Sequence, residues 1–272
     1  MVSLPQAQII SSRDNPLLKE LRRLAQDNTA YRKSGTAGRV WVEGDHLARA
    51  ALLRGWRPAL AVLAESAWLH WGGEFGDASH TGAERTVLLP DALFASISAL
   101  ESFSPAQGLG LVFDLPVEAT VQSGLSTVVL DRVQDAGNVG SILRSAAAFG
   151  CAQVLALKGT AALWSPKVLR AGMGAHFGLR LVEGLAADDL AVLQVPLLVT
   201  SSHQGELLHR AHLPWPCAWV LGHEGQGVGE ALMARAALKL RIAQPGGEES
   251  LNVAAAAAIC LHASALSGPA LS

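Results

Sequence analysis

Five short apolar segments with strand-like composition recur along the second half of the chain, and they constrain the fold more than any other feature. They are Thr127 to Leu130, Gln153 to Leu157, Pro196 to Thr200, Ala218 to Leu221 and Lys239 to Ile242. Stretches with helical character separate most of them. Strands that alternate with helices form parallel sheets covered on both faces. We therefore predict an α/β domain with a parallel sheet, in which a ligand binds at the carboxyl ends of the strands.

The first half of the chain predicts a smaller α/β unit. Asn15-Pro16 can start a helix, because Asn can cap it and Pro suits its first position, and Leu17, Leu21 and Leu24 share one face. The other predicted elements are a strand at Arg39 to Glu43, a helix at about Asp45 to Leu53, a strand at Ala59 to Leu63, a glycine-rich loop at Gly72 to Gly82, a helix near Asp91 to Ala99 and a strand at Leu109 to Phe113.

The segment that follows these elements is polar and contains Pro and Gly, as linkers do. We therefore predict an N-terminal domain at residues 1–115, a linker at 116–125 and a second domain at 126–272.

Charge is unevenly distributed along the chain. The net charge of −2 conceals a first segment, residues 1–57, with ten Lys or Arg against five Asp or Glu, so that this segment is +5 and the remainder −7. A basic segment favours a polyanion such as RNA, because neutralised phosphates release condensed counterions. Ordinary solvated helix faces carry similar excesses of positive charge, so the alternative is a basic surface without an RNA partner. The candidate RNA-binding residues are Arg22, Arg23, Arg32, Lys33 and Arg39.

Composition indicates a folded protein of the cytoplasm. Half of the residues are hydrophobic, and the longest apolar run, Val253 to Leu261, is well short of the roughly 18 residues of a membrane span. The N-terminus lacks the apolar core of an export signal. Cys151, Cys217 and Cys260 are odd in number and far apart, which indicates neither a disulfide framework nor a zinc site. We predict no membrane and no metal partner.

The first motif, N-V-G-S-I-L-R-S-A at residues 138–146, comes soon after the strand that ends near Asp131. Ser141, Arg144 and Ser145 share one helical face, so Arg144 can project from the first turns toward a cleft at the strand ends. The alternative is a capping Asn138 and a surface arginine on an alanine-rich helix.

The second motif, W-V-L-G-H-E-G-Q-G-V-G at residues 219–229, leads a strand into a glycine-dense turn that lets backbone approach a ligand closely. Its glycine spacing does not match the G-x-G-x-x-G of dinucleotide folds, and the next strand ends without the acidic partner of a ribose. His223-Glu224 does not form a zinc-binding H-E-x-x-H motif, because position 227 is Gly.

The third motif, I-A-Q-P-G-G-E-E-S-L-N-V at residues 242–253, joins a strand to an alanine-rich helix through a Pro-Gly-Gly loop. Ser250 is a plausible N-cap of that helix. This structural explanation leaves Asn252 without a reason.

In order and spacing, the three motifs resemble the SpoU (TrmH-like) family of the SPOUT superfamily, the RNA 2′-O-ribose methyltransferases, over about residues 126–266. The resemblance implies a C-terminal trefoil knot that binds bent S-adenosylmethionine, and a homodimer whose active site draws on both subunits. A looser match around Asn15-Pro16-Leu17 and Val42-Glu43-Gly44 is similar to the small α/β RNA-binding domain, related to a ribosomal protein fold, that often precedes this catalytic domain.

The resemblance also implies residue roles. Gly222, Ile242 and Leu251 should offer backbone contacts to the adenosyl part of the cofactor, and Glu224, Ser250 and Asn252 should shape the loops around it. Asn138 and Arg144 should face the RNA as catalytic residues. The family's counterpart of Arg144 is proposed as a base, but a guanidinium stays protonated in proteins. We therefore expect Arg144 to hold the phosphate and ribose oxygens and to stabilise the developing alkoxide.

The resemblance thus predicts transfer of a methyl group from S-adenosylmethionine to a ribose 2′-hydroxyl, without a metal, in ribosomal RNA in preference to transfer RNA. This chain departs from the family at His223, where Asn or another small residue is common, and at Ala243-Gln244, where Pro-Met is common. These departures either retune substrate choice or indicate a catalytically silent RNA-binding relative. A nucleotide-dependent oxidoreductase is a third reading.

Overall fold

The computed structural model describes residues 7–32, 38–98, 107–116, 119–201, 204–246 and 250–268. The chain forms two compact units. The first comprises Met1–Glu118 with Trp164–Leu169, and the second comprises Ala119–Leu163 with Arg170–Ser272. Within the described ranges, no helix combines the length and the apolar character needed to cross a membrane.

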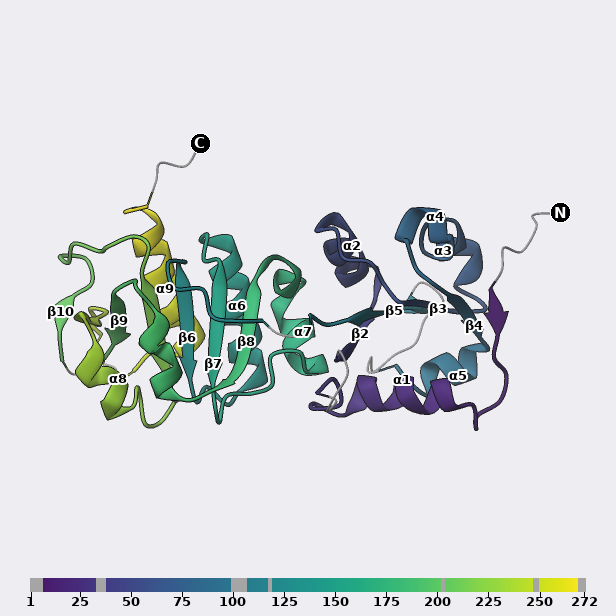
Figure 1. Cartoon of the computed structure of the whole chain (residues 1–272), viewed down its shortest axis with the longest axis horizontal. Coiled ribbons are helices and arrows are strands. Elements are labelled where there is room, and N and C mark those ends of the chain that lie inside the picture. Colours follow the sequence, from purple (N-terminus) through teal and green to yellow (C-terminus); the bar gives the residue numbers. More distant parts are fainter. Residues whose placement is uncertain are drawn as a thin grey trace. The chain divides into compact units, whose positions relative to one another are not determined.

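The first unit contains a mixed five-stranded sheet in the order β1-β4-β3-β5-β2. Figure 1 shows α1 and α5 on one face of this sheet and α2, α3 and α4 on the other. The strands are β1 (Gln8–Ile9), β2 (Arg39–Glu43), β3 (Leu60–Ala64), β4 (Thr86–Leu89) and β5 (Leu109–Asp114). The helices are α1 (Pro16–Gln26), α2 (Asp45–Leu53), α3 (Trp68–Phe75), α4 (Ala78–Thr81) and α5 (Asp91–Ala95).

Helix α1 starts as predicted but buries a slightly different face. The Asn15 side chain accepts a hydrogen bond from the Leu17 backbone N–H, which satisfies one of the unpaired donors of the first turn. Leu18, Leu21 and Leu24 are buried, whereas Leu17 is only half-buried. Both leucines lie at helical spacing from Leu21, so packing against the sheet decided between them.

The predicted glycine-rich loop at Gly72 to Gly82 is wrong, because α3 and α4 occupy most of it. One glycine within α3 and the glycine that follows it make room for an aromatic ring. A Cβ atom on Gly72 would lie 2.9 Å from the Trp68 ring, and one on Gly76 would lie 2.5 Å from it. Here glycine permits close packing within a helix and does not break it.

Other bounds in the first unit agree closely with the sequence analysis. β2 and α2 have their predicted bounds, and β3 and β5 are displaced or extended by one residue. The helix expected at Asp91 to Ala99 ends at Ala95, and residue 99 lies outside the described residues. Strands β1 and β4 were not predicted.

The second unit contains a seven-stranded sheet in the order β10-β12-β9-β11-β6-β7-β8. Every pairing in it is parallel, which confirms the predicted α/β fold with a parallel sheet. Its strands are β6 (Thr127–Asp131), β7 (Gln153–Leu157), β8 (Arg180–Leu185), β9 (Leu197–Thr200), β10 (Glu206–Leu207), β11 (Ala218–Gly222) and β12 (Leu238–Arg241). β8 and β10 are additional to the five predicted strands.

Helices surround this sheet (Figure 1). In this unit they are α6 (Ala136–Ala148), α8 (Glu230–Arg235) and α9 (Val253–Ala265), with two short 3₁₀ helices at Ala175–Gly178 and Ala187–Val192. Helix α7 (Pro166–Gly172) begins in the first unit and ends in the second. α6 packs against α9, and α9 packs on β11. The indole N–H of Trp219 on β11 donates to the Ser264 hydroxyl of α9 at 2.7 Å, so a buried polar contact sets the position of α9 on the sheet.

Candidate active site

A cavity of about 610 Å³ lies where β9, β11 and β12 end at their carboxyl sides. This volume is in the range of small-molecule sites. All six predicted cofactor-binding residues line it, namely Gly222, Glu224, Ile242, Ser250, Leu251 and Asn252. They come from two motifs that are distant in sequence, and the parallel sheet brings them together because its strand ends share one edge.

The glycine-dense turn forms one wall of this cavity. After Gly222 the chain folds back, and His223 and Gly227 exchange backbone hydrogen bonds of 3.1 and 2.8 Å. A Cβ atom on Gly222 would lie 2.2 Å from the backbone carbon of Gly227, and Gly227 itself has a φ of +68°. Only glycine allows the close approach at the first position, and glycine is strongly favoured at the second.

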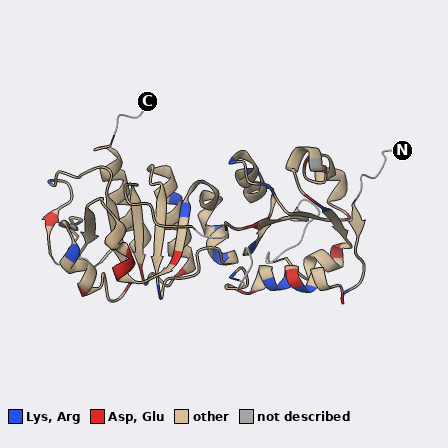
Figure 2. Ribbon diagram, in the orientation of Figure 1, with Lys and Arg blue, Asp and Glu red and all other residues tan. Residues whose placement is uncertain are grey.

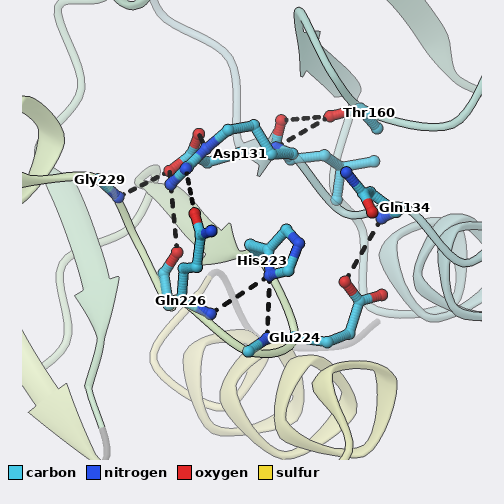
Figure 3. Close-up of polar contacts among 11 residues, drawn as sticks. Asp131, Gln134, Thr160, His223, Glu224, Gln226 and Gly229 are labelled. Atoms are coloured by element: carbon cyan, nitrogen blue, oxygen red, sulfur yellow. Dashed lines mark hydrogen bonds and ion pairs between the residues drawn. The ribbon is translucent and has the colours of Figure 1, made fainter.

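The His223 ring organises the turn from within. Its Nδ1 accepts hydrogen bonds from the backbone N–H groups of Gly225 at 2.9 Å and Gln226 at 3.2 Å (Figure 3). Because Nδ1 is an acceptor, the ring carries its proton on Nε2. His223 lines the cavity, so the departure from the family pattern noted at this position falls within the site.

A chain of three side chains connects the first, second and third motifs. Asn252 donates to the Asn138 side-chain oxygen at 3.0 Å, and Asn138 donates to the Glu224 carboxylate at 3.1 Å. The oxygen of Asn252 accepts from the backbone N–H groups of Ala254 and Ala255, which makes Asn252 the N-cap of α9. In both Asn138 and Asn252 the side-chain nitrogen donates and the side-chain oxygen accepts a hydrogen bond, and these partners fix the orientation of each amide group.

The predicted N-cap at Ser250 is wrong. Ser250 is exposed on the cavity wall, and Asn252 caps α9 two residues later. Ser and Asn are both good caps, so propensity could not choose between them. Capping of α9 is a structural role for Asn252 that the sequence alone did not indicate.

Glu224 is held as a carboxylate at the start of α6. It accepts from the backbone N–H groups of Gln134 and Asp135, both at 3.4 Å, besides the side chain of Asn138. Burial raises the pKa of this carboxyl, but hydrogen bonds from its own backbone N–H and from Asn138, Asp135 and Gln134 outweigh burial, so the pKa is lowered. The three-residue chain therefore ends on a negative charge at neutral pH.

Arg144 lies apart from this cavity within a single chain. It is exposed on α6, does not line the cavity, and makes no hydrogen bond or ion pair within the described part of the chain. Helical geometry, at about 100° per residue, turns it about 120° from Asn138 around the helix. Asp135, and not Asn138, caps α6. The expected projection of Arg144 into its own strand-end cleft is thus not seen.

Figure 2 shows Lys and Arg residues on the first unit, which contains the candidate RNA-binding arginines. Some of these arginines have partners there. Arg39 pairs with Asp114 at 2.8 Å, and Arg22 donates to the Ser96 hydroxyl at 3.1 Å. Arg32 donates to the Tyr31 hydroxyl at 3.1 Å. Arg23 is exposed on α1 and, with Lys19, lines an open groove on that helix. Lys33 lies outside the described residues.

Sequence reasoning did not single out Gln244 as a contact or the pair Asp131 and Arg132 as site residues. Gln244 lines the cavity, and its buried Oε1 accepts no hydrogen bond from any described residue. Asp131 is the last residue of β6, where the rule on strand ends could have drawn attention to it.

An open parallel α/β sheet with a cavity of this size at its strand ends defines the class of cofactor-binding α/β enzymes. Residues 126–262 match the SpoU rRNA Methylase family, which confirms the family predicted from the three motifs. The chain belongs to this family.

Individual relatives extend the comparison beyond the matched region. The chain is 32% identical over 185 residues to 23S rRNA (guanosine(2553)-2′-O)-methyltransferase RlmP of Bacillus subtilis, covering 67% of this chain and 73% of that protein. It is 39% identical over 111 residues to rRNA methyltransferase 3B, mitochondrial, of Danio rerio, covering 37% of this chain and only 25% of that protein.

Solved structures show the same fold over both units. A putative RNA methyltransferase of the TrmH family from Porphyromonas gingivalis is 31% identical, with a TM-score of 0.75, over 91% of this chain and 96% of that one. An AdoMet-bound rRNA methyltransferase from Sinorhizobium meliloti, 24% identical with a TM-score of 0.77 over 95% of this chain and 97% of that one, shares the fold.

Proposed function

We propose that the protein is an S-adenosylmethionine-dependent RNA methyltransferase that methylates a ribose 2′-hydroxyl, in ribosomal RNA in preference to transfer RNA. The observation that carries the proposal is the convergence of Gly222, Ile242 and Leu251 on one cavity. The name of the Bacillus subtilis relative specifies 2′-O-methylation of 23S rRNA, which supports both the chemistry and the substrate class.

The residues of the cavity fit this cofactor. Leu240, Ile242 and Leu251 supply apolar surface for an adenine ring, and the glycine turn leaves backbone accessible. The buried oxygen of Gln244, which has no donor among the residues that the structure describes, suits a ligand with hydrogen-bond donors, such as the amino and hydroxyl groups of an adenosyl moiety. S-adenosylmethionine supplies an electrophilic methyl group when bound, and the protein then has to align the 2′-oxygen and help remove its proton.

Arg144 and Asn138 take different roles in this proposal. An arginine guanidinium is a hydrogen-bond donor and not a base in proteins, so Arg144 orients phosphate and ribose oxygens and stabilises the developing alkoxide. Asn138 uses both ends of its amide on Glu224 and Asn252. It therefore holds the loops in place and does not receive a proton.

The proposal includes a homodimer whose active sites draw on both subunits, because Arg144 does not line the cavity of its own chain. In the dimer, Arg144 of each chain would face the cavity of the other. The surface of α9 supports this assembly, since Ile259 is 42% exposed although the helix is apolar on all sides. A helix with apolar residues all round is normally buried.

The domain assignment is likewise part of the proposal. Residues 126–272 form the methyltransferase domain with its trefoil knot, and residues 1–115 form a small RNA-binding domain joined by a linker at 116–125. The net charge of +5 on residues 1–57 supports the RNA-binding role. A cytoplasmic location completes the proposal.

The test of the catalytic role is Arg144→Ala. We expect this variant to keep its affinity for S-adenosylmethionine in calorimetry and to lose methyl transfer, because Arg144 does not line the cavity of its own chain and in the proposed dimer contacts the RNA. Arg180→Ala, which removes another exposed arginine of the second unit, is the matched control and should be active. Wild-type turnover by Arg144→Ala would remove Arg144 from the active site.

Two further measurements test the rest. A catalytically silent RNA-binding relative would give no heat of binding with S-adenosylmethionine. Comparing 2′-O-methyl positions in RNA from cells with and without the protein should reveal a missing site in ribosomal RNA, whereas a missing site only in transfer RNA would contradict the substrate preference.

A further inference from the structure

Arg132 adopts a backbone conformation that L-residues rarely take. Its φ is +62°, in the left-handed region that favours glycine. Among the described residues, Met173 at +49° is the one other non-glycine residue with a positive φ. Non-glycine residues persist in this region where the surrounding structure holds them, and they cluster at functional sites.

Several contacts hold Arg132 at the end of β6. Its backbone N–H donates to the Thr160 hydroxyl at 3.1 Å, and its guanidinium donates to both carboxylate oxygens of Asp131, at 2.9 and 3.1 Å. Asp131 is buried, and the two-pronged contact matches the planar fork of arginine. Lysine could not reproduce this geometry.

The same two side chains reach across to the glycine turn. Arg132 donates to the Gln226 side-chain oxygen at 2.9 Å and to the Gly227 backbone oxygen at 3.4 Å. Asp131 accepts from the backbone N–H of Gly229 at 2.7 Å. Figure 3 shows the dashed contact between Asp131 and the backbone nitrogen of Gly229.

The turn needs external anchors. Gly225, Gln226 and Gly227 are exposed, and glycine loses more conformational freedom on ordering than any other residue. The His223 ring organises the first half of the turn from within, whereas the contacts from Asp131 and Arg132 secure its tip and its end.

From this geometry we propose that Arg132, locked by Asp131, is a positioning residue that holds the glycine turn in the conformation that binds the cofactor. The inference rests on the proposed function, in which this cavity binds S-adenosylmethionine. Arg132 acts through the turn and does not itself line the cavity. If the glycine turn is already ordered, ligand binding does not have to order it and loses less entropy. The contacts from Arg132 and Asp131 therefore contribute to cofactor affinity.

The experiment is Arg132→Gly, measured in the full-length protein. Glycine takes a positive φ without strain, but the buried Asp131 carboxylate loses its ion-pair partner, so we expect the melting temperature to fall by a few degrees. Affinity for S-adenosylmethionine in calorimetry should fall about tenfold, as expected for the loss of charge-assisted anchors. In the methyltransferase assay, the KM for S-adenosylmethionine should rise in parallel while kcat at saturation changes little. Arg132→Lys, which keeps the charge but not the fork, should weaken affinity to an intermediate degree.

Met173→Gly is the matched control. It relieves the same kind of backbone conformation at a residue that does not line the cavity, so cofactor affinity should be unchanged. Wild-type affinity in both Arg132 variants would overturn the inference and leave the proposed function intact. Absence of binding by the wild-type protein would instead refute the proposed function.

Discussion

At the scale of single residues, the buried side-chain oxygen of Gln244 allows a test of its role in ligand binding. Its buried Oε1 has no donor among the described residues, and an unsatisfied buried polar group costs roughly 1–3 kcal/mol. Gln244→Met keeps the approximate volume and removes that atom. We expect stability to urea to rise by about 1 kcal/mol, while affinity for S-adenosylmethionine falls severalfold. Unchanged cofactor affinity would show that Gln244 does not accept a hydrogen bond from the ligand.

His176 makes the stability of the second unit depend on pH. Burial lowers its pKa from 6.5 to about 4, against a smaller opposing effect of its hydrogen bond to the Leu163 carbonyl at 2.9 Å. Between these two pH values the unfolded chain binds the proton and the folded chain does not. Its contribution to stability is therefore fully present above about pH 6.5 and is lost as the pH falls toward 4, by roughly 3 kcal/mol in total.

Urea denaturation at pH 7 and pH 4.5 measures this effect. His176→Gln can still donate to Leu163 but does not titrate, so its stability should fall less than that of the wild type over the same interval. Comparing the two proteins cancels the titration of the carboxylates they share. Identical losses in both would mean that His176 does not contribute to acid sensitivity.

At the scale of elements, Asn252 serves both the helix and the site, and two substitutions separate these roles. Asn252→Asp keeps an oxygen that can cap α9, whereas Asn252→Ala removes the cap and should cost about 1 kcal/mol of stability. Both remove the donor to Asn138. We expect methyl transfer to be impaired in both variants, and thermal melting to be lowered only in Asn252→Ala. A fully active Asn252→Asp would show that the link to Asn138 is dispensable.

At the scale of the whole molecule, the proposed division of labour places RNA affinity in the first unit and cofactor affinity in the second. Charge reversal of Arg22, Arg23 and Arg32 should weaken RNA binding, most strongly at low salt, and leave S-adenosylmethionine affinity unchanged. Because Arg22 also donates to Ser96, Arg23→Glu alone is the cleaner variant, and melting curves of both control for folding. RNA affinity that does not change would separate this unit from recognition.

The sequence by itself determined the local elements and the family. Runs of buried apolar residues such as Gln153 to Leu157 read as strands of a parallel sheet, because such strands are covered on both faces. The glycine-dense turn was also predicted from the sequence as a place of close backbone approach. In the structure the chain folds back over Gly222 and leaves no room for a Cβ atom there. The spacing of the three motifs then led to the SpoU family and to the six residues that line one cavity.

Only the tertiary structure decided which of several locally equivalent choices is used. Ser250 and Asn252 can both cap a helix, and packing of α9 on β11 and α6 selected Asn252. Gly72 can break a helix or make room for a ring, and Trp68 decided for the helix. The pairing of Asp131 and Arg132 with a turn more than 90 residues away depends on β6 and β11 lying side by side. Local propensity describes a residue and its neighbours in sequence, whereas these outcomes depend on contacts that form only when distant segments pack together.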